Sequence, residues 1–343
     1  MPYTVSDKTC RDCLVNKPAI DFTRKAASPD GLAPYCRDCS KDRRDRRRAR
    51  QLGRTPASRS APTPTIEGRA DYIMPRDVLA TWAAVQMIAA DGDPAPNMFF
   101  VGPSGSGKTE AGRAMATLAG LPFVKVDAPA MTDEEVWFGT REVVVENGAP
   151  KTVYHESAFV RALQMPCVLV IDEANRTADR VRNILLAVLD DTRSVTNPLT
   201  GETVVRHPEC YIILTGNVGL AFTGTYAVDI AFTTRALTSR FEYLSPSEET
   251  AVAIGRTGVS EKDAALFVRF ATESRTRAKA DADFPPISTR EVLTACRLVA
   301  KGLDRTTAAR QAIINAASDE GGAESTQAAL ELIWAGINPD RGY

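Results

Sequence analysis

An eight-residue stretch of the chain has the residue types and the spacing needed to hold a phosphate group. It fits the pattern G-x-x-x-x-G-K-[ST] at every fixed position, and its residues are Gly102, Pro103, Ser104, Gly105, Ser106, Gly107, Lys108 and Thr109. Glycines let the backbone curl so that successive N–H groups point inward at a phosphate. Lys108 could then reach the β- and γ-phosphates of a nucleotide, and the Thr109 hydroxyl could ligate Mg²⁺.

Two carboxylates follow a hydrophobic run further along the chain. Residues 168–171 read Val-Leu-Val-Ile, and Asp172 and Glu173 come directly after them. In phosphate-loop enzymes an aspartate at this place holds the magnesium shell, and the next glutamate orients and polarises the attacking water. An ordinary charged strand end is the alternative interpretation, and the distance from the phosphate loop favours the catalytic one.

The sequence pattern around these residues predicts a parallel sheet with helices between its strands. Predicted strands alternate with helical patterns, over 97–101, 123–126, 167–171 and 211–214, and the last two are continuous β-branched or aliphatic runs. Strands buried on both faces of a parallel sheet have such runs. A helix over 110–119 would place the phosphate at its N-terminus, where the macrodipole favours negative charge.

Helical patterns also precede and follow this α/β region. Residues 74–90 have the spacing of an amphipathic helix, with Leu79, Trp82, Val85 and Ile88 near one face. After about residue 246 the patterns are helical only, and the predicted helices are 246–255, 260–280, 288–300, 304–317 and 323–335.

Composition and charge narrow the class of protein. The 343 residues predict two to three domains, and 44% apolar residues are enough for sizeable cores. There is no run of about 18 apolar residues, so we expect no membrane span, and residues 1–7 lack the order of a secretory signal. Residues 1–59 have a net charge of +8 and the rest of the chain −9. A basic arm on an acidic body indicates that the arm meets an anionic partner.

Four of the seven cysteines form two C-x-x-C pairs, which are Cys10 with Cys13 and Cys36 with Cys39. Two such pairs can supply four thiolates to one tetrahedral Zn²⁺. A module of this size has too little core to fold without a staple, and Phe22, Leu32 and Tyr35 could form its small apolar face. Unconnected buried or redox cysteines are the alternative, and the usage favours a reducing cytosol. Cys167, Cys210 and Cys296 are interpreted as core residues.

Residues 102–109 and 168–176 resemble those of the AAA+ ATPases. In that family, Leu-Thr-Gly before Asn217 resembles the sensor-1 strand end, which helps to position the attacking water. The segment around Arg240 resembles A-L-x-x-R-F, whose arginine reaches into the neighbouring subunit's nucleotide, with Arg235 as the alternative finger. The segment Ile-Ser-Thr-Arg290 resembles the sensor-2 helix start. The implied catalytic residues are Lys108, Glu173, Asn217 and Arg240, and Arg290 would contact the nucleotide.

Within that family, residues 172–176 and 185–192 are similar to the MoxR-like, CbbQ-like and dynein-related branch. Two inserted hairpins are expected, over 137–159 and 195–208. The resemblance covers roughly residues 72–300 and implies ATP rather than GTP, together with Mg²⁺ bound by Thr109 and Asp172. It also implies a homo-oligomeric ring, with a hexamer as the expected form.

The cysteine stretch resembles treble-clef-like zinc modules common in bacteriophage proteins. Some of those modules belong to nucleases that use histidines, but residues 1–60 contain no histidine, so a binding role is expected. Residues 41–50 form an arginine-rich run. Through this run, residues 37–59 could contact the phosphates of a nucleic acid, and docking to an acidic protein is equally compatible. A solvated helix or linker is the third interpretation.

These observations predict four segments and two main functions. The segments are a zinc module of four cysteines with a basic tail (1–45), a basic Pro/Ser-rich linker (46–71), an AAA+ nucleotide-binding α/β domain (72–245) and a helical lid (246–343). We expect a cytoplasmic protein of a bacterium, or of the bacterial host if the gene belongs to a phage. We expect ATP hydrolysis that remodels an unknown client protein, with a DNA translocase as the alternative. A nucleotide-dependent switch is a third possibility, which Glu173 and Arg240 argue against.

Overall fold

The computed structural model describes residues 7–10, 16–25, 31–41, 44, 72–146, 149–177, 179–217, 230–281 and 284–338. Its centre is a five-stranded sheet in the order β13-β5-β12-β9-β6, in which every neighbouring pair is parallel. The strands are β5 (Asn97–Gly102), β6 (Phe123–Asp127), β9 (Cys167–Asp172), β12 (Cys210–Asn217) and β13 (Ala236–Arg240). The α/β fold and the four predicted strands are confirmed.

The fifth strand, β13, was not among the predicted strands. It lies at the edge of the sheet beside β5, and only Ser239 of its five residues is buried. An edge strand that buries one residue has no continuous apolar run, so its sequence carries no strand signal.

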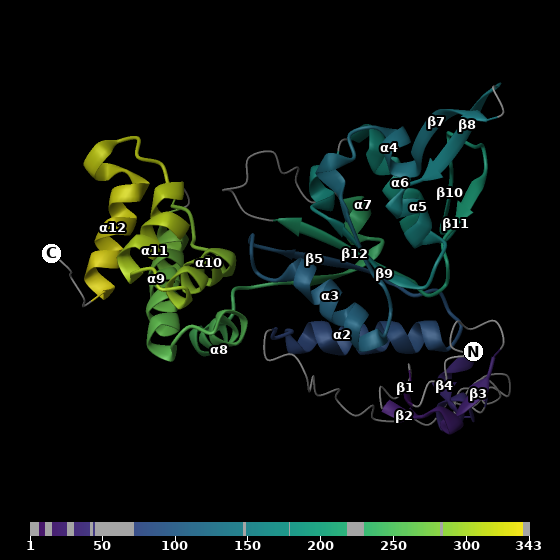
Figure 1. The fold of residues 1–343 in the computed structure, drawn as a ribbon, viewed down its shortest axis with the longest axis horizontal. Coiled ribbons are helices and arrows are strands. Elements are labelled where there is room, and N and C mark those ends of the chain that lie inside the picture. The colour runs from purple at the N-terminus through teal and green to yellow at the C-terminus, as the bar shows by residue number, and fades with distance from the viewer. Residues whose placement is uncertain are drawn as a thin grey trace.

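Helices cover both faces of the sheet (Figure 1). One face packs against α2 (Arg76–Ala90) and α3 (Lys108–Ala119) through residues such as Phe100, Val170 and Ile213. The other face packs against α4 (Glu134–Phe138), α5 (Ala158–Leu163), α6 (Asp179–Leu189) and α7 (Ile230–Thr233). Successive strand residues enter opposite cores, as the period of two in a strand requires.

The predicted apolar face of α2 is partly wrong. Trp82 and Val85 are buried and Leu79 packs against the core, as expected, whereas Ile88 is 37% exposed and Val78 is buried in addition. Residues 78, 82, 85 and 89 follow the helical spacing of one stripe, and Ala89 packs against the core where Ile88 was expected.

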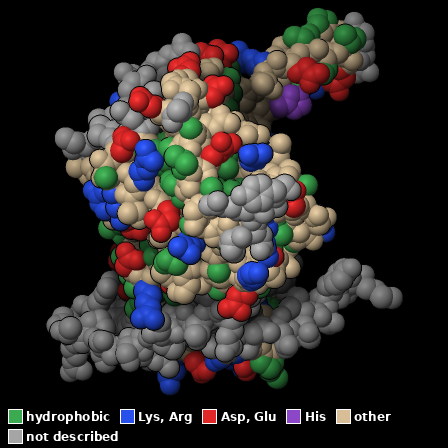
Figure 2. Space-filling model, turned by 90° about the vertical axis from the view of Figure 1, so that its left-hand side faces the viewer, with side chains coloured by type: hydrophobic (Ala, Val, Ile, Leu, Met, Phe, Trp, Pro, Cys, Tyr) green, Lys and Arg blue, Asp and Glu red, His purple; other side chains and the backbone are tan. Residues whose placement is uncertain are grey.

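Both expected hairpins are present. The longer one joins β7 (Gly139–Glu146) to β8 (Ala149–Glu156), and the shorter one joins β10 (Ser194–Thr196) to β11 (Thr203–Val205). The β7–β8 hairpin extends away from the body of the molecule (Figure 2). It carries exposed Val143 and Val145, so its outer part buries little apolar surface in a single chain.

The C-terminal region is helical, as predicted. It contains α8 (Pro246–Thr257), α9 (Glu261–Ala280), α10 (Thr289–Ala300), α11 (Arg305–Ala312) and α12 (Thr326–Ile337). A side-chain cap starts each of these helices, and the capping residues are Ser245, Ser260, Ser288, Asp304 and Ser325. The region has its own core, in which Trp334 stacks on Phe267. This core is separate from the cores of the sheet domain.

The N-terminal module contains two small antiparallel sheets. They are β1 (Asp7–Thr9) with β2 (Asn16–Pro18), and β3 (Phe22–Arg24) with β4 (Leu32–Cys36). Buried Phe22 packs with cysteines, and Leu32 and Tyr35 lie against this cluster, as expected. The predicted linker 46–71 lies outside the described residues. Within the described ranges, no helix is both long and apolar enough to cross a membrane.

Candidate active site

The phosphate loop connects β5 to α3 and depends on two glycines with left-handed backbone. Gly105 has φ of +71° and Gly107 has φ of +93°. A Cβ on Gly105 would lie 2.8 Å from the Cβ of Ser288, and one on Gly107 would lie 3.2 Å from the ring of Tyr72. The loop therefore needs glycine for its conformation and for the close approach of the segments that cover it.

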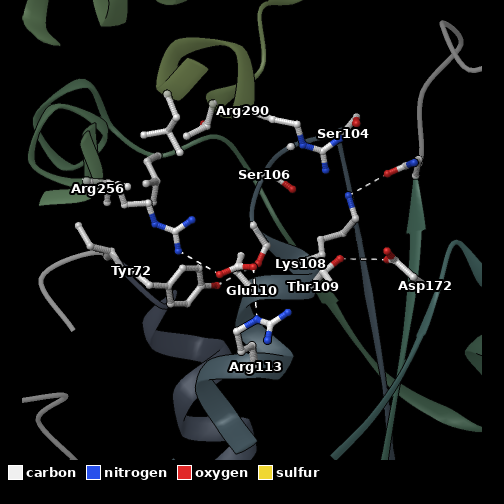
Figure 3. Close-up of a pocket in the computed structure, with 18 of the residues that line it drawn as sticks. Tyr72, Ser104, Ser106, Lys108, Thr109, Glu110, Arg113, Asp172, Arg256 and Arg290 are labelled. Carbon is white, nitrogen blue, oxygen red and sulfur yellow. Dashed lines mark hydrogen bonds and ion pairs between the residues drawn. The ribbon is translucent and has the colours of Figure 1, made fainter. Parts of the chain in front are cut away.

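A cavity of about 390 Å³ opens over this loop. The sheet domain and the helical region both line it, so it lies where the two regions meet (Figure 3). The predicted residues that line it are Ser104, Gly105, Ser106, Gly107, Lys108, Thr109, Asp172, Glu173, Asn217 and Arg290. Gly102 and Pro103 are not among the described residues that line the cavity, but their carbonyl oxygens accept hydrogen bonds from Lys108.

The Lys108 side chain is folded onto the loop and is only 6% exposed. Its ammonium donates to the carbonyl oxygens of Gly102 (2.9 Å) and Pro103 (2.7 Å) and to Asn217 Oδ1 (2.9 Å). Burial lowers the pKa of Lys108 to about 8, against a smaller upward effect of the nearby carboxylates. The Lys108 ammonium is therefore removed from water and is not neutralised by a direct partner among the described carboxylates. Its charge is available to a phosphate, as a phosphate-binding lysine requires.

Asp172 is an ionised carboxylate held beside Thr109. Thr109 Oγ1 donates to Asp172 Oδ1 at 3.0 Å, and Lys125 Nζ lies 3.0 Å from Oδ2. The Thr215 hydroxyl also donates to Oδ1. Burial raises the pKa of Asp172, but these hydrogen bonds and the Lys125 charge outweigh it and leave the pKa below its usual range. A hydroxyl and a carboxylate in contact are ligands that Mg²⁺ accepts.

Glu173 is held in place from two sides. Asn217 Nδ2 donates to Glu173 Oε1 at 3.0 Å, and Arg176 Nη1 lies 3.4 Å from Oε2. Its backbone has φ of +53°, and its N–H donates to Thr215 Oγ1 at 3.0 Å. A non-glycine residue in this conformation costs about 1–3 kcal/mol, so the surrounding contacts must over-determine it, as at many functional sites.

The structure thus brings Lys108, Asn217 and Glu173 into one chain of contacts. None of the three predicted arginines belongs to this chain of contacts. Arg290 is the second residue of α10 and lines the cavity beside the phosphate loop. Arg240 ends β13, is exposed, and pairs in register with Val101. Neither Arg240 nor Arg235 is among the described residues that line the cavity.

Arg235 lies just before the other end of β13. Its Nη2 is 3.6 Å from Asp190 Oδ2, and its carbonyl oxygen accepts a hydrogen bond from Asn97 Nδ2. Arg235 is therefore engaged within its own chain, next to the start of β5, whereas Arg240 is exposed and lies beside the end of β5, where the phosphate loop begins.

Sequence reasoning missed several residues of the cavity, which are Tyr72, Ile73, Glu110, Arg113, Lys125, Leu244, Val252, Arg256, Thr289, Leu293 and Arg297. Tyr72 Oη donates to the Gly107 carbonyl at 3.2 Å, and burial raises the pKa of Tyr72. Arg256 Nη2 lies 3.0 Å from Glu110 Oε2 and so connects α8 to α3 (Figure 3). Two of these residues had a sequence signal: Lys125 is a charged residue within the predicted strand 123–126, and Thr289 belongs to the segment singled out before Arg290.

The cysteines of the N-terminal module also meet. The Sγ atoms of Cys10, Cys36 and Cys39 lie within 4.8 Å of one another, and all three residues are buried. The N–H of Cys36 donates to Cys10 Sγ at 3.2 Å, and Lys17 Nζ lies 3.5 Å from Cys36 Sγ. Burial raises the pKa of Cys36, but hydrogen bonds from Cys39 and Cys10 and the Lys17 charge bring it below its usual value. This cluster could bind a metal such as zinc.

Two predicted features of the same module cannot be placed. Cys13 lies outside the described residues, and so do residues 42, 43 and 45–59 of the segment 37–59.

Two protein families match this chain. Residues 97–241 match the AAA domain of the dynein-related subfamily, and residues 249–336 match the CbbQ/NirQ/NorQ C-terminal family. Together the matches support an AAA+ ATPase of the MoxR/CbbQ type, and the AAA domain supports ATPase activity.

Individual relatives share 25–30% of their residues with this chain over the matched regions. An uncharacterized protein of Staphylococcus saprophyticus is 30% identical over 149 residues, which is 43% of this chain and 56% of that protein, so the match spans little more than half of the relative's length. An uncharacterized protein of Staphylococcus aureus is 25% identical over 245 residues, covering 69% of this chain and 90% of the relative. Among solved structures, a RuvB variant of Thermotoga maritima has a TM-score of 0.46 and 15% identity, covering 73% of this chain and 72% of its own.

Proposed function

We propose, from an AAA+ domain of the MoxR/CbbQ type, that the protein couples magnesium-dependent ATP hydrolysis to the remodelling of a client protein. The observation that carries the proposal is the single chain of contacts from Lys108 through Asn217 to Glu173, with the Thr109–Asp172 pair in the same cavity. These residues supply a phosphate-binding cation, a metal-ligating pair and a base held by an amide.

Each group then has a role in hydrolysis. Backbone N–H groups of the phosphate loop and Lys108 would bind the β- and γ-phosphates. Magnesium, held by Thr109 and Asp172, would offset phosphate charge. Glu173 would take a proton from a water that attacks the γ-phosphorus as the bond to the β–γ bridging oxygen breaks. Asn217 would hold Glu173 and the water in line, which is the geometry that its 3.0 Å contact supports.

Arg240 at the end of β13 is not among the described residues that line the cavity of its own chain, so an arginine finger would have to come from a neighbouring subunit. Arg240 is exposed at the end of its strand, and an arginine supplied by a neighbouring subunit typically contributes about 10³–10⁵ in rate. We propose Arg240 for this role and a homo-oligomeric ring, with a hexamer as the expected form, since repeated heterologous contacts close into rings.

Remodelling of a protein is favoured over movement along DNA by the charge of the body. Residues 60–343 carry a net charge of −9, and a central DNA channel needs a positive lining. The β7–β8 hairpin offers Val143 and Val145 to an apolar client segment. The N-terminal module would recruit the client, or nucleic acid through residues 37–59, and its cysteines would hold zinc. A protein with these free thiols fits the reducing cytoplasm of a bacterium or of a phage host.

The test is ATP turnover by the full chain, with and without double-stranded DNA and over a salt series. Remodelling predicts turnover that DNA does not change, whereas strong stimulation with a steep salt slope would favour the DNA motor. Glu173→Gln should bind ATP without turning it over, and Lys108→Ala should lose nucleotide binding. Normal turnover by Glu173→Gln would refute the assignment of the base.

A further inference from the structure

The start of α10, which carries Arg290, is held by an unusual set of buried contacts. Ser274 Oγ accepts a hydrogen bond from the Ile287 N–H at 3.1 Å, and Arg275 Nε donates to the Ile287 carbonyl at 2.8 Å. The backbone N–H and carbonyl of Ile287 are therefore both held by side chains of adjacent residues of α9. One residue later, Ser288 caps α10 with a capping box.

A buried ion pair holds the next residue. Arg275 binds Glu249 with two hydrogen bonds of 2.7 and 2.8 Å, and the side chains of Arg275 and Glu249 are 11% and 0% exposed. Glu249 Oε1 also accepts from Thr289 Oγ1 at 2.6 Å. Thr289 directly precedes Arg290, so a carboxylate of α8 anchors the first turn of α10. Bidentate geometry makes this anchor rigid as well as strong.

The same guanidinium reaches the phosphate loop through an aromatic ring. Arg275 lies over the ring of Tyr243, with its Cζ 3.9 Å from the ring centroid, and Tyr243 Oη donates to the Ser104 carbonyl at 3.3 Å. Burial raises the pKa of Tyr243 to about 12, so the hydroxyl keeps its proton for this bond. The start of α10 also lies close to the loop, since a Cβ on Gly105 would be 2.8 Å from the Cβ of Ser288 and 3.6 Å from that of Arg290. Arg290 and Ser104 both line the cavity (Figure 3).

We propose that Glu249 and Arg275 are positioning residues, which set the location of Arg290 relative to the phosphate loop through Thr289 and Tyr243. The inference rests on the proposed function, in which Arg290 contacts the nucleotide. Arg290 could contact the γ-phosphate, and so distinguish ATP from ADP, only if the start of α10 were fixed relative to the phosphate loop. The network should therefore give the pocket a higher affinity for ATP than for ADP.

The test removes one hydroxyl and leaves the buried ion pair intact, because Glu249→Gln could unfold the lid. In Thr289→Val the affinity for ATP should fall about tenfold while the affinity for ADP changes little, as measured with a fluorescent nucleotide. Thr289→Ser keeps the hydroxyl and should restore the wild-type ratio. Thr276→Val, which removes an exposed hydroxyl of α9 bonded only to its own helix, is the matched control.

A double-mutant cycle shows whether the effect passes through Arg290. Thr289→Val should cost nothing further in an Arg290→Ala background, because the residue that it positions is gone. Independent, additive losses would overturn the inference, and so would equal losses of ATP and ADP affinity, or an Arg290→Ala variant that keeps the wild-type ratio. If the wild-type chain binds no ATP at all, the proposed function fails as well, so the two failures are distinguishable.

Discussion

Lys108 is a buried cation whose described hydrogen bonds all go to uncharged oxygen atoms. Its ammonium donates to two carbonyl oxygens and to one side-chain amide oxygen. Its pKa is therefore lowered to about 8 by burial. A triphosphate in the loop would favour the charged form, so the empty and occupied sites should bind protons differently.

We predict that ATP affinity falls as the pH rises above about 8. Below that pH Lys108 is charged in both states, but above it the empty site has lost its proton and binding must take one up. Affinity should fall by at most about tenfold per pH unit, and the phosphate's own ionisation is complete well below this range. Calorimetry at pH 9 in buffers of different ionisation enthalpy measures the uptake. An affinity that stays constant from pH 7 to 9 would show that Lys108 remains charged.

At the scale of elements, the two hairpins are tied to each other. Asn197 of the shorter hairpin is 2% exposed, and its Nδ2 donates to Tyr154 Oη of β8 at 2.8 Å. Tyr154 Oη in turn donates to the Phe138 carbonyl at 2.5 Å, and Arg141 of β7 donates to the Leu199 carbonyl. The hairpin that leads back to β12, the strand of Asn217, is thus fixed to the hairpin that extends from the body.

Tyr154→Phe should loosen this connection. The substitution leaves the buried Asn197 amide without its Tyr154 partner, which typically costs about 1–3 kcal/mol of unfolding free energy. The Phe138 carbonyl keeps its hydrogen bond from the Ser157 N–H. Denaturant unfolding measures the loss, and hydrogen exchange in residues 194–205 should speed up. Thr152→Ala, at an exposed position of the same strand, should stay within about 0.5 kcal/mol of the wild type. Equal stability of the two variants would show that the contact contributes nothing.

At the scale of the whole molecule, an active ring should be recoverable from two inactive variants. Arg240→Ala lacks the proposed finger and Glu173→Gln lacks the base, but a mixed ring forms some interfaces with both groups intact. In an equal mixture about one quarter of interfaces would be complete, and ATP turnover should rise accordingly. A mixture no more active than its components would reject a finger in trans from Arg240, and Arg235→Ala is then tested in the same way.

We also predict one tightly bound zinc ion per chain. Metal analysis of the full chain should detect it, and Cys36→Ser should abolish it, because four thiolates complete a tetrahedral site. Chelation should unfold the N-terminal module and leave ATP turnover unchanged, since the sheet domain and the lid have their own cores. A zinc-free chain with a folded N-terminal module would refute the staple.

The sequence alone determined the phosphate loop, the acid pair and the strands that end at them, and the fold class followed. These features are readable because each depends on neighbouring residues: glycines that permit a curled backbone, and continuous apolar runs that are buried on both faces. Arg290 was also predicted from its local motif, and the structure places it beside the loop, although its role remains a proposal.

Only the tertiary structure decided which distant residues complete the site. Tyr72 and Arg256 reach the cavity from segments far from the loop in sequence, and the Glu249–Arg275 pair is buried among helices whose sequence shows only ordinary amphipathic patterns. β13 escaped prediction because an edge strand needs no apolar run. Contacts of this kind depend on how whole elements pack, and a single sequence encodes that packing without a local pattern that marks it.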